Sequence, residues 1–243
     1  MYIAGMDARR FPAQLPRFLR HQFPVLARGM LAEIDKAFHE SATKPGAYLL
    51  QLGAFDGHFD DPVRPYIEQY HLPALLIEPQ LEPFRQLERR YRRNSGICLG
   101  RYALAESEGP VLLYTRGHGS ERFWGANTTT DPEQLKRAVR GHWLSAATSG
   151  TTTRTEVVEG LPLDSILKKH EVDPKDLTMV VTDIEGSDVL AMQQLFETDA
   201  DPQLIQYEHL RAMHADTQTI EKELGARGYQ LFTTYKDTIA FKG

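Results

Sequence analysis

Short apolar segments alternate with amphipathic segments along most of the chain. Short apolar runs bounded by glycine, proline or polar residues predict strands over 48–52, 74–79, 97–105, 179–186 and 204–209. Between most of these runs apolar residues recur at helical spacing, which predicts helices over 60–70, 81–93, 187–197 and 216–227. Strands that alternate with helices favour a parallel sheet covered by helices on both faces.

The two ends of the chain depart from this alternation. The last two apolar runs, 229–235 and 238–243, are separated by too few residues for a parallel crossover, so we expect them to pair antiparallel. Residues 1–45 carry several prolines and then a helical apolar pattern. They predict a helical extension that packs on the main domain, 46–243, either as a lid or as the contact of a homo-oligomer.

The segment 116–160 fits the alternation least. An apolar run just before it, 111–115, predicts an extra strand. Within the segment, "RGHGSERFWGANTTT" and "SAATSGTTTRTE" indicate loops on either side of a helix near 131–144.

Composition and charge limit the class of protein. The chain of 243 residues is 41% hydrophobic and 25% charged, which is typical of a soluble globular protein. Its formal net charge of -5 argues against a general nucleic-acid binder, and the basic run 85–93 is interpreted as the solvated face of an amphipathic helix. No apolar run approaches the ~18 residues of a membrane span. The single cysteine, Cys98, suits a reducing compartment, so we expect a cytoplasmic protein.

Polar residues follow the predicted strands at the point where each strand ends. They are the turn 51–57, Glu78, Asp183 with Glu185, and Glu208 with His209. Because the carboxyl ends of parallel strands meet at one edge of a sheet, these residues predict a pocket there. Taken singly, an acid such as Glu78 or Asp188 could equally begin the next helix.

The glycines of the turn 51–57 limit the class of ligand that the pocket can bind. The turn reads G-A-F-D-G, which lacks the G-x-G-x-x-G pattern that closes over a pyrophosphate, and no P-loop pattern occurs elsewhere. A nicotinamide oxidoreductase is therefore disfavoured. Glu78 ends the second strand, where its carboxylate could accept both hydroxyls of a ribose. Together these features suit a nucleoside without a pyrophosphate.

Five motifs occur in order along the chain: "GAFDGHFDDP" at 53–62, "ALLIEP" at 74–79, "VTDIEGSD" at 181–188, "YEHL" at 207–210 and "KDTIAF" at 236–241. In this order and spacing they resemble the FkbM-type family of S-adenosylmethionine-dependent methyltransferases. The resemblance implies a Rossmann-like class I methyltransferase fold, with a seven-stranded, mostly parallel sheet and a C-terminal antiparallel hairpin. It also implies O-methylation of a hydroxyl on a small molecule, such as a sugar or a natural product.

The resemblance assigns residues to a cofactor site. Glu78 would hold the ribose, and Tyr102 and Ala103 would flank the adenine. The rest of the predicted cofactor site is Gln51, Gly53, Ala54, Phe55, Gly57, Pro79 and Asp183. Gln51 stands where the family commonly has an acid, and Phe55 where it has asparagine, so the methionine amino group would be held differently. Acceptor specificity would come from the two regions outside the resemblance, the first 45 residues and 116–160. In 116–160, the side chains that either contact the acceptor or simply pack are His118, Trp124, Asn127, His142 and Trp143.

Methyl transfer to a hydroxyl requires a group that takes the hydroxyl proton. His209 is the first candidate for this base, because histidine titrates near neutral pH, and Asp183 and Glu185 come next. Two of these candidates also have a structural alternative: His209 could fix the loop after its strand, and Glu185 could be a carboxylate at the start of a helix. Asp183, Glu208 and His209 could instead hold Mg²⁺, but we favour a site without metal.

A second class of function remains open at this point. With Gln51 and Phe55 altered, the chain could be a catalytically degenerate methyltransferase domain that serves as a binding or scaffold module. Four retained residues favour the enzyme: Glu78, Asp183, Glu185 and His209.

Overall fold

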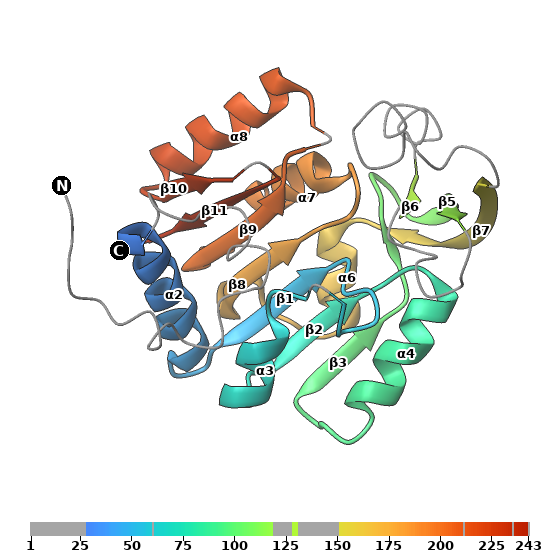
Figure 1. Ribbon diagram of the computed structural model, residues 1–243, viewed down its shortest axis with the longest axis horizontal. Helices are drawn as coiled ribbons and strands as arrows, with labels where there is room; N and C mark the ends of the chain where they lie inside the picture. The colour runs from blue at the N-terminus through green and yellow to red at the C-terminus, as the bar shows by residue number, and fades with distance from the viewer. Residues whose placement is uncertain are drawn as a thin grey trace.

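The computed structural model describes residues 28–59, 61–118, 128–130, 151–210, 212–234 and 236–242, and it is built around one large sheet (Figure 1). Its strands, in spatial order, are β10 (Gln230–Thr233), β11 (Asp237–Phe241), β9 (Leu204–Glu208), β8 (Leu177–Thr182), β1 (Tyr48–Leu52), β2 (Ala74–Ile77) and β3 (Ile97–Gly100). The sheet is mixed, because β11 runs antiparallel to both of its neighbours while the other pairs are parallel. The mostly parallel sheet and the terminal hairpin agree with the sequence.

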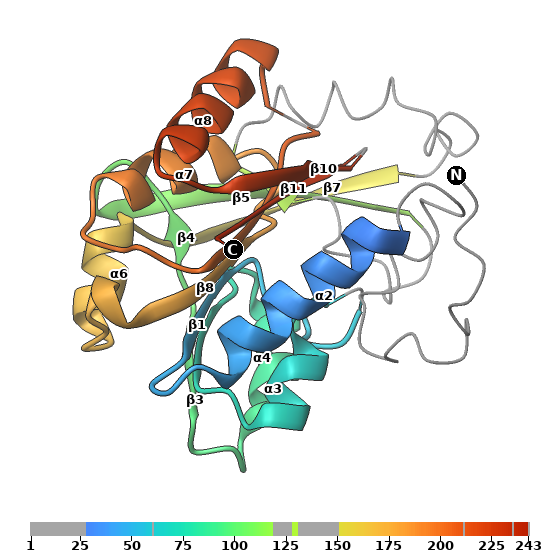
Figure 2. The same cartoon turned by 90° about the vertical axis from the view of Figure 1, so that its left-hand side faces the viewer.

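Helices cover both faces of this sheet (Figure 2). One face carries α2 (Arg28–Thr43), α3 (Arg64–Tyr70) and α4 (Leu81–Tyr91), and the other carries α6 (Leu163–Lys169), α7 (Asp188–Phe196) and α8 (His214–Ala226). A single turn of 3-10 helix, Pro174–Asp176, precedes β8. Alternate residues of each strand enter opposite cores: Leu49 packs on the α2 side and Leu50 on the α6 side. Within the described parts of the chain, no helix is long and apolar enough to cross a membrane.

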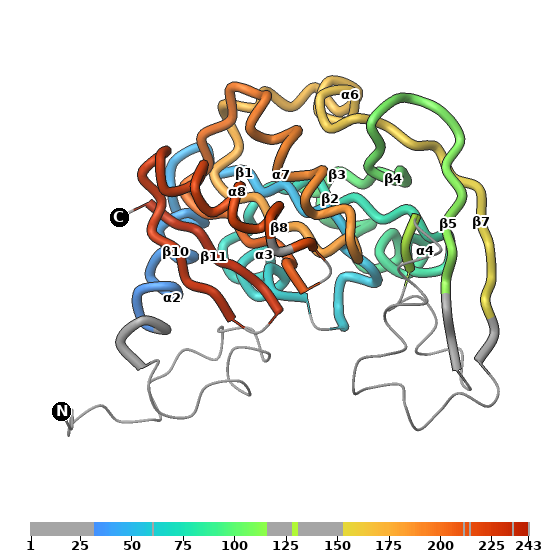
Figure 3. The backbone as a smooth tube through the Cα atoms, turned by 90° about the horizontal axis from the view of Figure 1, so that it is seen from above, coloured from blue at the N-terminus to red at the C-terminus, as the bar shows by residue number. Residues whose placement is uncertain are grey.

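A second, four-stranded sheet lies beyond the ends of β1 and β2 (Figure 1). It consists of β4 (Ala103–Leu104), β7 (Thr151–Leu161), β5 (Gly109–His118) and β6 (Thr128–Thr129) in that spatial order. Seen from above, β5 and β7 run side by side along one end of the molecule, near α4 (Figure 3). Glu156 of β7 ties this sheet to the large one, since it pairs with Arg101 and accepts a hydrogen bond of 3.3 Å from the backbone N–H of Leu81.

The structure corrects three expectations. The strand expected over 97–105 is two strands in different sheets: β3 pairs with β2, and Ala103 and Leu104 pair with Gly160 and Leu161. The loop expected over 145–156 is wrong from Thr151 onward, because the threonine-rich sequence there forms β7. Threonine is β-branched and favours a strand that has a partner, which β5 supplies.

The third correction concerns the helix expected to begin at residue 60. It begins at Arg64, because Asp61 closes a turn before it by accepting the backbone N–H groups of Val63 and Arg64 at 3.0 and 3.3 Å. The helix expected near 131–144 and most of the extension 1–45 lie outside the described residues. The extra strand expected over 111–115 is confirmed as part of β5.

Candidate functional site

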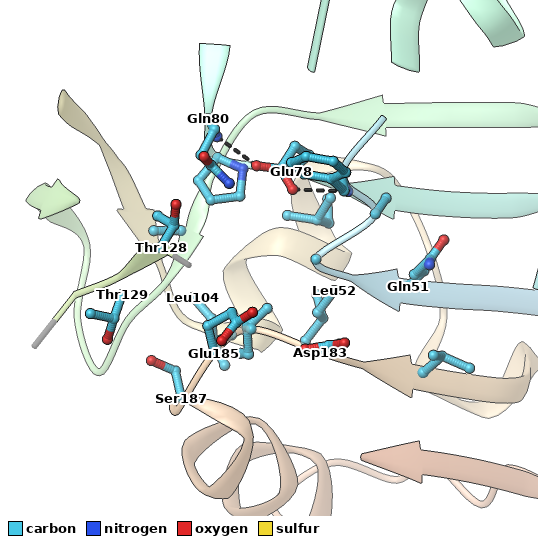
Figure 4. Close-up of a pocket in the computed structure, with 18 of the residues that line it drawn as sticks. Gln51, Leu52, Glu78, Gln80, Leu104, Thr128, Thr129, Asp183, Glu185 and Ser187 are labelled. Carbon is cyan, nitrogen blue, oxygen red and sulfur yellow. Dashed lines mark hydrogen bonds between the residues drawn. The ribbon is translucent and has the colours of Figure 1, made fainter. Parts of the chain in front are cut away.

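A cavity of about 300 Å³ opens at the carboxyl ends of β1, β2 and β8. The second sheet forms its opposite wall through Leu104, Leu113 and Thr128 to Thr130. Figure 4 shows side chains from both sheets directed toward this space. Most of the residues that the sequence singled out line it: Gln51, Gly53, Ala54, Phe55, Glu78, Pro79, Tyr102, Ala103, Asp183 and Glu185.

Glu78 follows β2 with its side chain 2% exposed. Its two carboxyl oxygens each accept a backbone N–H, at 2.9 Å from Phe55 and 2.8 Å from Gln80 (Figure 4). Burial raises the pKa of this carboxyl group to about 7, although the two hydrogen bonds oppose the shift. Each carboxylate oxygen can accept more than one hydrogen bond, so Glu78 can still receive donors from a ligand.

The two predicted glycines of the turn have different roles. Gly53 has φ +85° and lies so close to β8 that a Cβ would collide with the carbonyl oxygen of Asp183. It therefore lets the turn pass over the neighbouring strand. Gly57 is absent from the cavity lining within the described chain. Its φ is +65°, and a Cβ there would come within 2.7 Å of Leu87 on α4, so this glycine serves packing rather than the cavity.

A lysine that the sequence reasoning missed organises the acidic side of the cavity. Lys236 lines the cavity, and its Nζ lies 2.7 Å from Asp183 Oδ2 and 3.6 Å from Glu208 Oε1. Burial opposes the charge of Lys236, but the negative charges of Asp183 and Glu208 raise its pKa. Burial and the charges of Asp183 and Glu185 raise the pKa of Glu208 to about 9, so Glu208 keeps its proton near neutral pH. The charged partner of Lys236 is therefore chiefly Asp183. In the sequence, the feature that could have indicated a role for Lys236 in the site was its position at the start of the motif 236–241.

The structure does not bring His209 into the cavity. His209 is not one of the described lining residues; its Nδ1 lies 3.1 Å from Thr238 Oγ1, and its backbone N–H donates to the carbonyl of Lys236 at 2.9 Å. This arrangement matches a histidine that fixes the loop after its strand. Of the candidate bases, Asp183 and Glu185 face the cavity instead (Figure 4).

Asp188 has a structural role that the sequence had left open. It begins α7 and is 2% exposed, and it accepts hydrogen bonds from Thr182 Oγ1 and from the backbone N–H groups of Ile184 and Gly186. Burial and the nearby charge of Asp183 raise its pKa to about 6. Asp188 thus fixes the loop that carries Asp183 and Glu185.

The described residues contain no group of three side chains placed to bind a metal ion. There, Asp183, Glu208 and His209 do not form a group of three ligands that could hold an ion. The ammonium group of Lys236 lies between the side chains of Asp183 and Glu208. Of the candidates for acceptor contacts, Trp124, Asn127, His142, Trp143 and the His118 side chain lie outside what the structure describes.

Several buried hydrogen-bond acceptors that line the cavity have no partner in the described part of the chain. Among the described residues these buried atoms are Gln51 Oε1, Asp61 Oδ2, Asp183 Oδ1 and Gln206 Oε1. All four are oxygens, so a ligand that fits them must supply donors or positive charge. A nucleoside that carries an ammonium group and a sulfonium, as S-adenosylmethionine does, meets this requirement.

The comparison with known proteins agrees with the motifs. Residues 52–231 match the profile of the methyltransferase FkbM domain. Because the match spans more than half of the chain, the protein belongs to the FkbM methyltransferase family, as the motifs predicted. No curated protein matches the chain at a significant level.

Two solved structures show a limited similarity to the chain. The methyltransferase FkbM from Methylobacillus flagellatus KT is 15% identical, over 80% of this chain and 43% of that chain, with a TM-score of 0.46. The fibrillarin/Nop5p complex is 11% identical, over 81% of this chain and 72% of that chain, with a TM-score of 0.39. The chain thus spans less than half the length of the first of these proteins.

Proposed function

We propose that the protein is an S-adenosylmethionine-dependent methyltransferase that methylates a hydroxyl group of a small-molecule acceptor. The observation that carries the proposal is the cavity at the carboxyl edge of the sheet, faced by a buried Glu78 and by a set of acceptor oxygens that have no partner among the described residues. Membership of the FkbM methyltransferase family supports the same reading.

The order of the strands gives the cofactor a direction in the cavity. Tyr102 and Ala103 follow β3 and would flank the adenine, and Glu78, at the end of β2, would accept the ribose hydroxyls. The turn after β1, with Gly53 and Phe55, would then receive the methionine end. When bound, S-adenosylmethionine supplies an electrophilic methyl group on sulfur.

Asp183 is the group that we place opposite the acceptor hydroxyl. Lys236 holds Asp183 Oδ2 at 2.7 Å, while Oδ1 is buried and has no partner within the described structure. Oδ1 can therefore take the hydroxyl proton, and the nearby Lys236 charge stabilises the carboxylate before that transfer. Glu185 lies on the same loop and adds negative charge at this end of the cavity. Much of the acceleration would come from orientation, with the second sheet excluding water.

The proposal can be tested by binding and by turnover. Calorimetry with S-adenosylhomocysteine tests the cofactor, and transfer of an isotope-labelled methyl group into a panel of hydroxylated sugars and natural products tests the reaction. We expect Asp183→Asn to lower kcat by roughly 10²- to 10⁴-fold and His209→Ala to leave kcat nearly unchanged, since Asp183 lines the cavity and His209 is not one of its described lining residues. The reverse ranking would return the role of base to His209.

The same measurements separate the enzyme from the binding module. Binding of S-adenosylhomocysteine with no transfer to any acceptor of the panel would favour the degenerate module. Absence of binding would refute the cofactor site itself.

A further inference from the structure

We propose that Asp61 is the carboxylate that binds the ammonium group at the methionine end of the cofactor, in place of an acid at position 51. The inference rests on the proposed function and adds a binding residue that the sequence did not single out. It begins from Gln51, the penultimate residue of β1, which has a neutral side chain where a cationic group of the ligand needs a negative partner.

The two oxygens of Asp61 have different surroundings. Oδ1 accepts three hydrogen bonds: from Val63 N at 3.0 Å, from Arg64 N at 3.3 Å and from Gln51 Nε2 at 3.2 Å. Oδ2 is buried and has no partner among the described residues, although Asp61 lines the cavity. One oxygen is thus used by the turn before α3 and by Gln51. The other is left for a ligand.

Asp61 also orients the amide of Gln51. A carboxylate oxygen only accepts hydrogen bonds, so the Gln51 nitrogen must face Asp61 and the amide oxygen must face away from it. That oxygen, Gln51 Oε1, is buried without a partner in the described part of the chain, and the side chain is 3% exposed. The pair therefore presents two acceptor oxygens, one of them charged.

A third acceptor comes from the same face of the sheet. The strand register places Gln51, Val181 and Gln206 in one row across β1, β8 and β9, so Gln51 and Gln206 point to the same face. Gln206 is 5% exposed, its Oε1 is likewise without a partner in the described structure, and it lines the cavity. A primary ammonium group has three N–H donors and one positive charge, which matches three acceptors of which one is anionic.

The position along the cavity selects the methionine end of the ligand. A nucleoside whose adenine and ribose lie beside Tyr102 and Glu78, at the ends of β3 and β2, reaches β1 next. The group attached to its ribose must therefore pass Gln51 and Asp61. Burial raises the pKa of Asp61 to about 6, against the opposing effect of its hydrogen bonds, and a bound cation would restore the ionised form.

Two ligands separate this contact from the rest of the site. S-adenosylhomocysteine carries the amino group, and 5′-methylthioadenosine has the same adenine and ribose but neither the amino nor the carboxyl group of the methionine end. We expect Asp61→Asn to weaken the calorimetric affinity for S-adenosylhomocysteine roughly 10- to 100-fold, the range for a lost charge-assisted hydrogen bond. The affinity for 5′-methylthioadenosine should stay within about twofold of the wild type.

Asparagine at position 61 keeps the oxygen that closes the turn before α3. Its amide oxygen can still accept the N–H groups of Val63 and Arg64, as Asn and Asp do in such turns. If Asp61→Asn does not give a cooperative thermal transition, Asp61→Ser offers a second turn-forming residue without the charge. The matched control is Asp56→Asn, because Asp56 closes the preceding turn with hydrogen bonds of 2.8 and 2.7 Å from the backbone N–H groups of His58 and Phe59 and does not line the cavity.

Rescue by moving the charge makes the test specific. Gln51→Glu combined with Asp61→Asn exchanges the amide and the carboxylate across their hydrogen bond. We expect this double variant to regain at least half of the lost affinity, on a logarithmic scale, for S-adenosylhomocysteine. Equal losses for both ligands in Asp61→Asn, or no loss for either, would overturn the assignment while leaving the cofactor site intact. Failure of the wild type to bind either ligand would overturn the proposed function, and the assignment with it.

Discussion

Glu78 should make binding of the nucleoside depend on pH. Its carboxyl group is 2% exposed, and burial raises its pKa to about 7. The hydroxyls of a ribose donate hydrogen bonds, so they bind the ionised carboxylate rather than the protonated acid. Between pH 8 and pH 6 the ionised fraction falls from roughly nine-tenths to roughly one-tenth. Affinity should therefore fall about tenfold, which corresponds to about 1.4 kcal/mol.

Calorimetric titration with 5′-methylthioadenosine at pH 6, 7 and 8 measures this dependence. The ligand lacks the methionine amino and carboxyl groups, so Asp61 should not contribute to the slope. Glu78→Gln removes the titrating group at similar size, and its affinity should not change with pH. At pH 8 the variant should bind more weakly by about 1.5–3 kcal/mol, because a hydrogen bond to a charged group is lost.

The same shift predicts how the unliganded protein responds to pH. The folded pKa of Glu78, about 7, lies above the ordinary value of 4.5, so the folded state binds the proton more tightly than the unfolded chain. Its contribution to stability is fully present below pH 4.5 and is lost as pH rises through 7. The loss in free energy of unfolding from pH 5 to pH 8 should be larger in the wild type than in Glu78→Gln by on the order of 2–3 kcal/mol.

Two results would refute this reasoning about Glu78. An affinity of the wild type that stays constant from pH 6 to pH 8 would show that the ribose does not depend on this carboxylate. A pH slope that persists in Glu78→Gln would place the titrating group elsewhere. Thermal unfolding of Glu78→Gln is the necessary control, because the side chain also accepts the N–H groups of Phe55 and Gln80.

Two further predictions concern the frame of the site and its charges. Gly53→Ala should lower the free energy of unfolding by at least ~2 kcal/mol, because a Cβ at φ +85° meets the Asp183 carbonyl. The control Gly225→Ala should be neutral or slightly stabilising, because Gly225 lies in the last turn of α8 with open space around its Cβ position. Equal denaturant midpoints for the two variants would contradict this prediction. Methyl transfer should continue in EDTA, because Lys236 already supplies positive charge beside Asp183 and Glu208. Loss of transfer in EDTA, with recovery on adding Mg²⁺, would show that a metal is required.

The sequence by itself determined the alternation of strands and helices, because burial imposes a periodicity that local residues must follow. Strand β1 agrees with the prediction at both ends, and the hairpin of β10 and β11 agrees in pairing. The family followed from motifs whose residues are close in sequence. Glu78 and Asp183 could be placed at the cavity because each directly follows a strand, and strand ends share one edge of a parallel sheet.

Only the tertiary structure decided which side chains meet. Ala103 and Leu104 are as apolar as β3, and nothing local shows that they pair with β7 instead of β2. The contact between Gln51 and Asp61 depends on how the turn after β1 folds back, and the contact of Lys236 with Asp183 joins residues that are far apart in sequence. The position of His209 outside the cavity has the same cause, since the direction of a side chain after a strand is set by the loop packed against it.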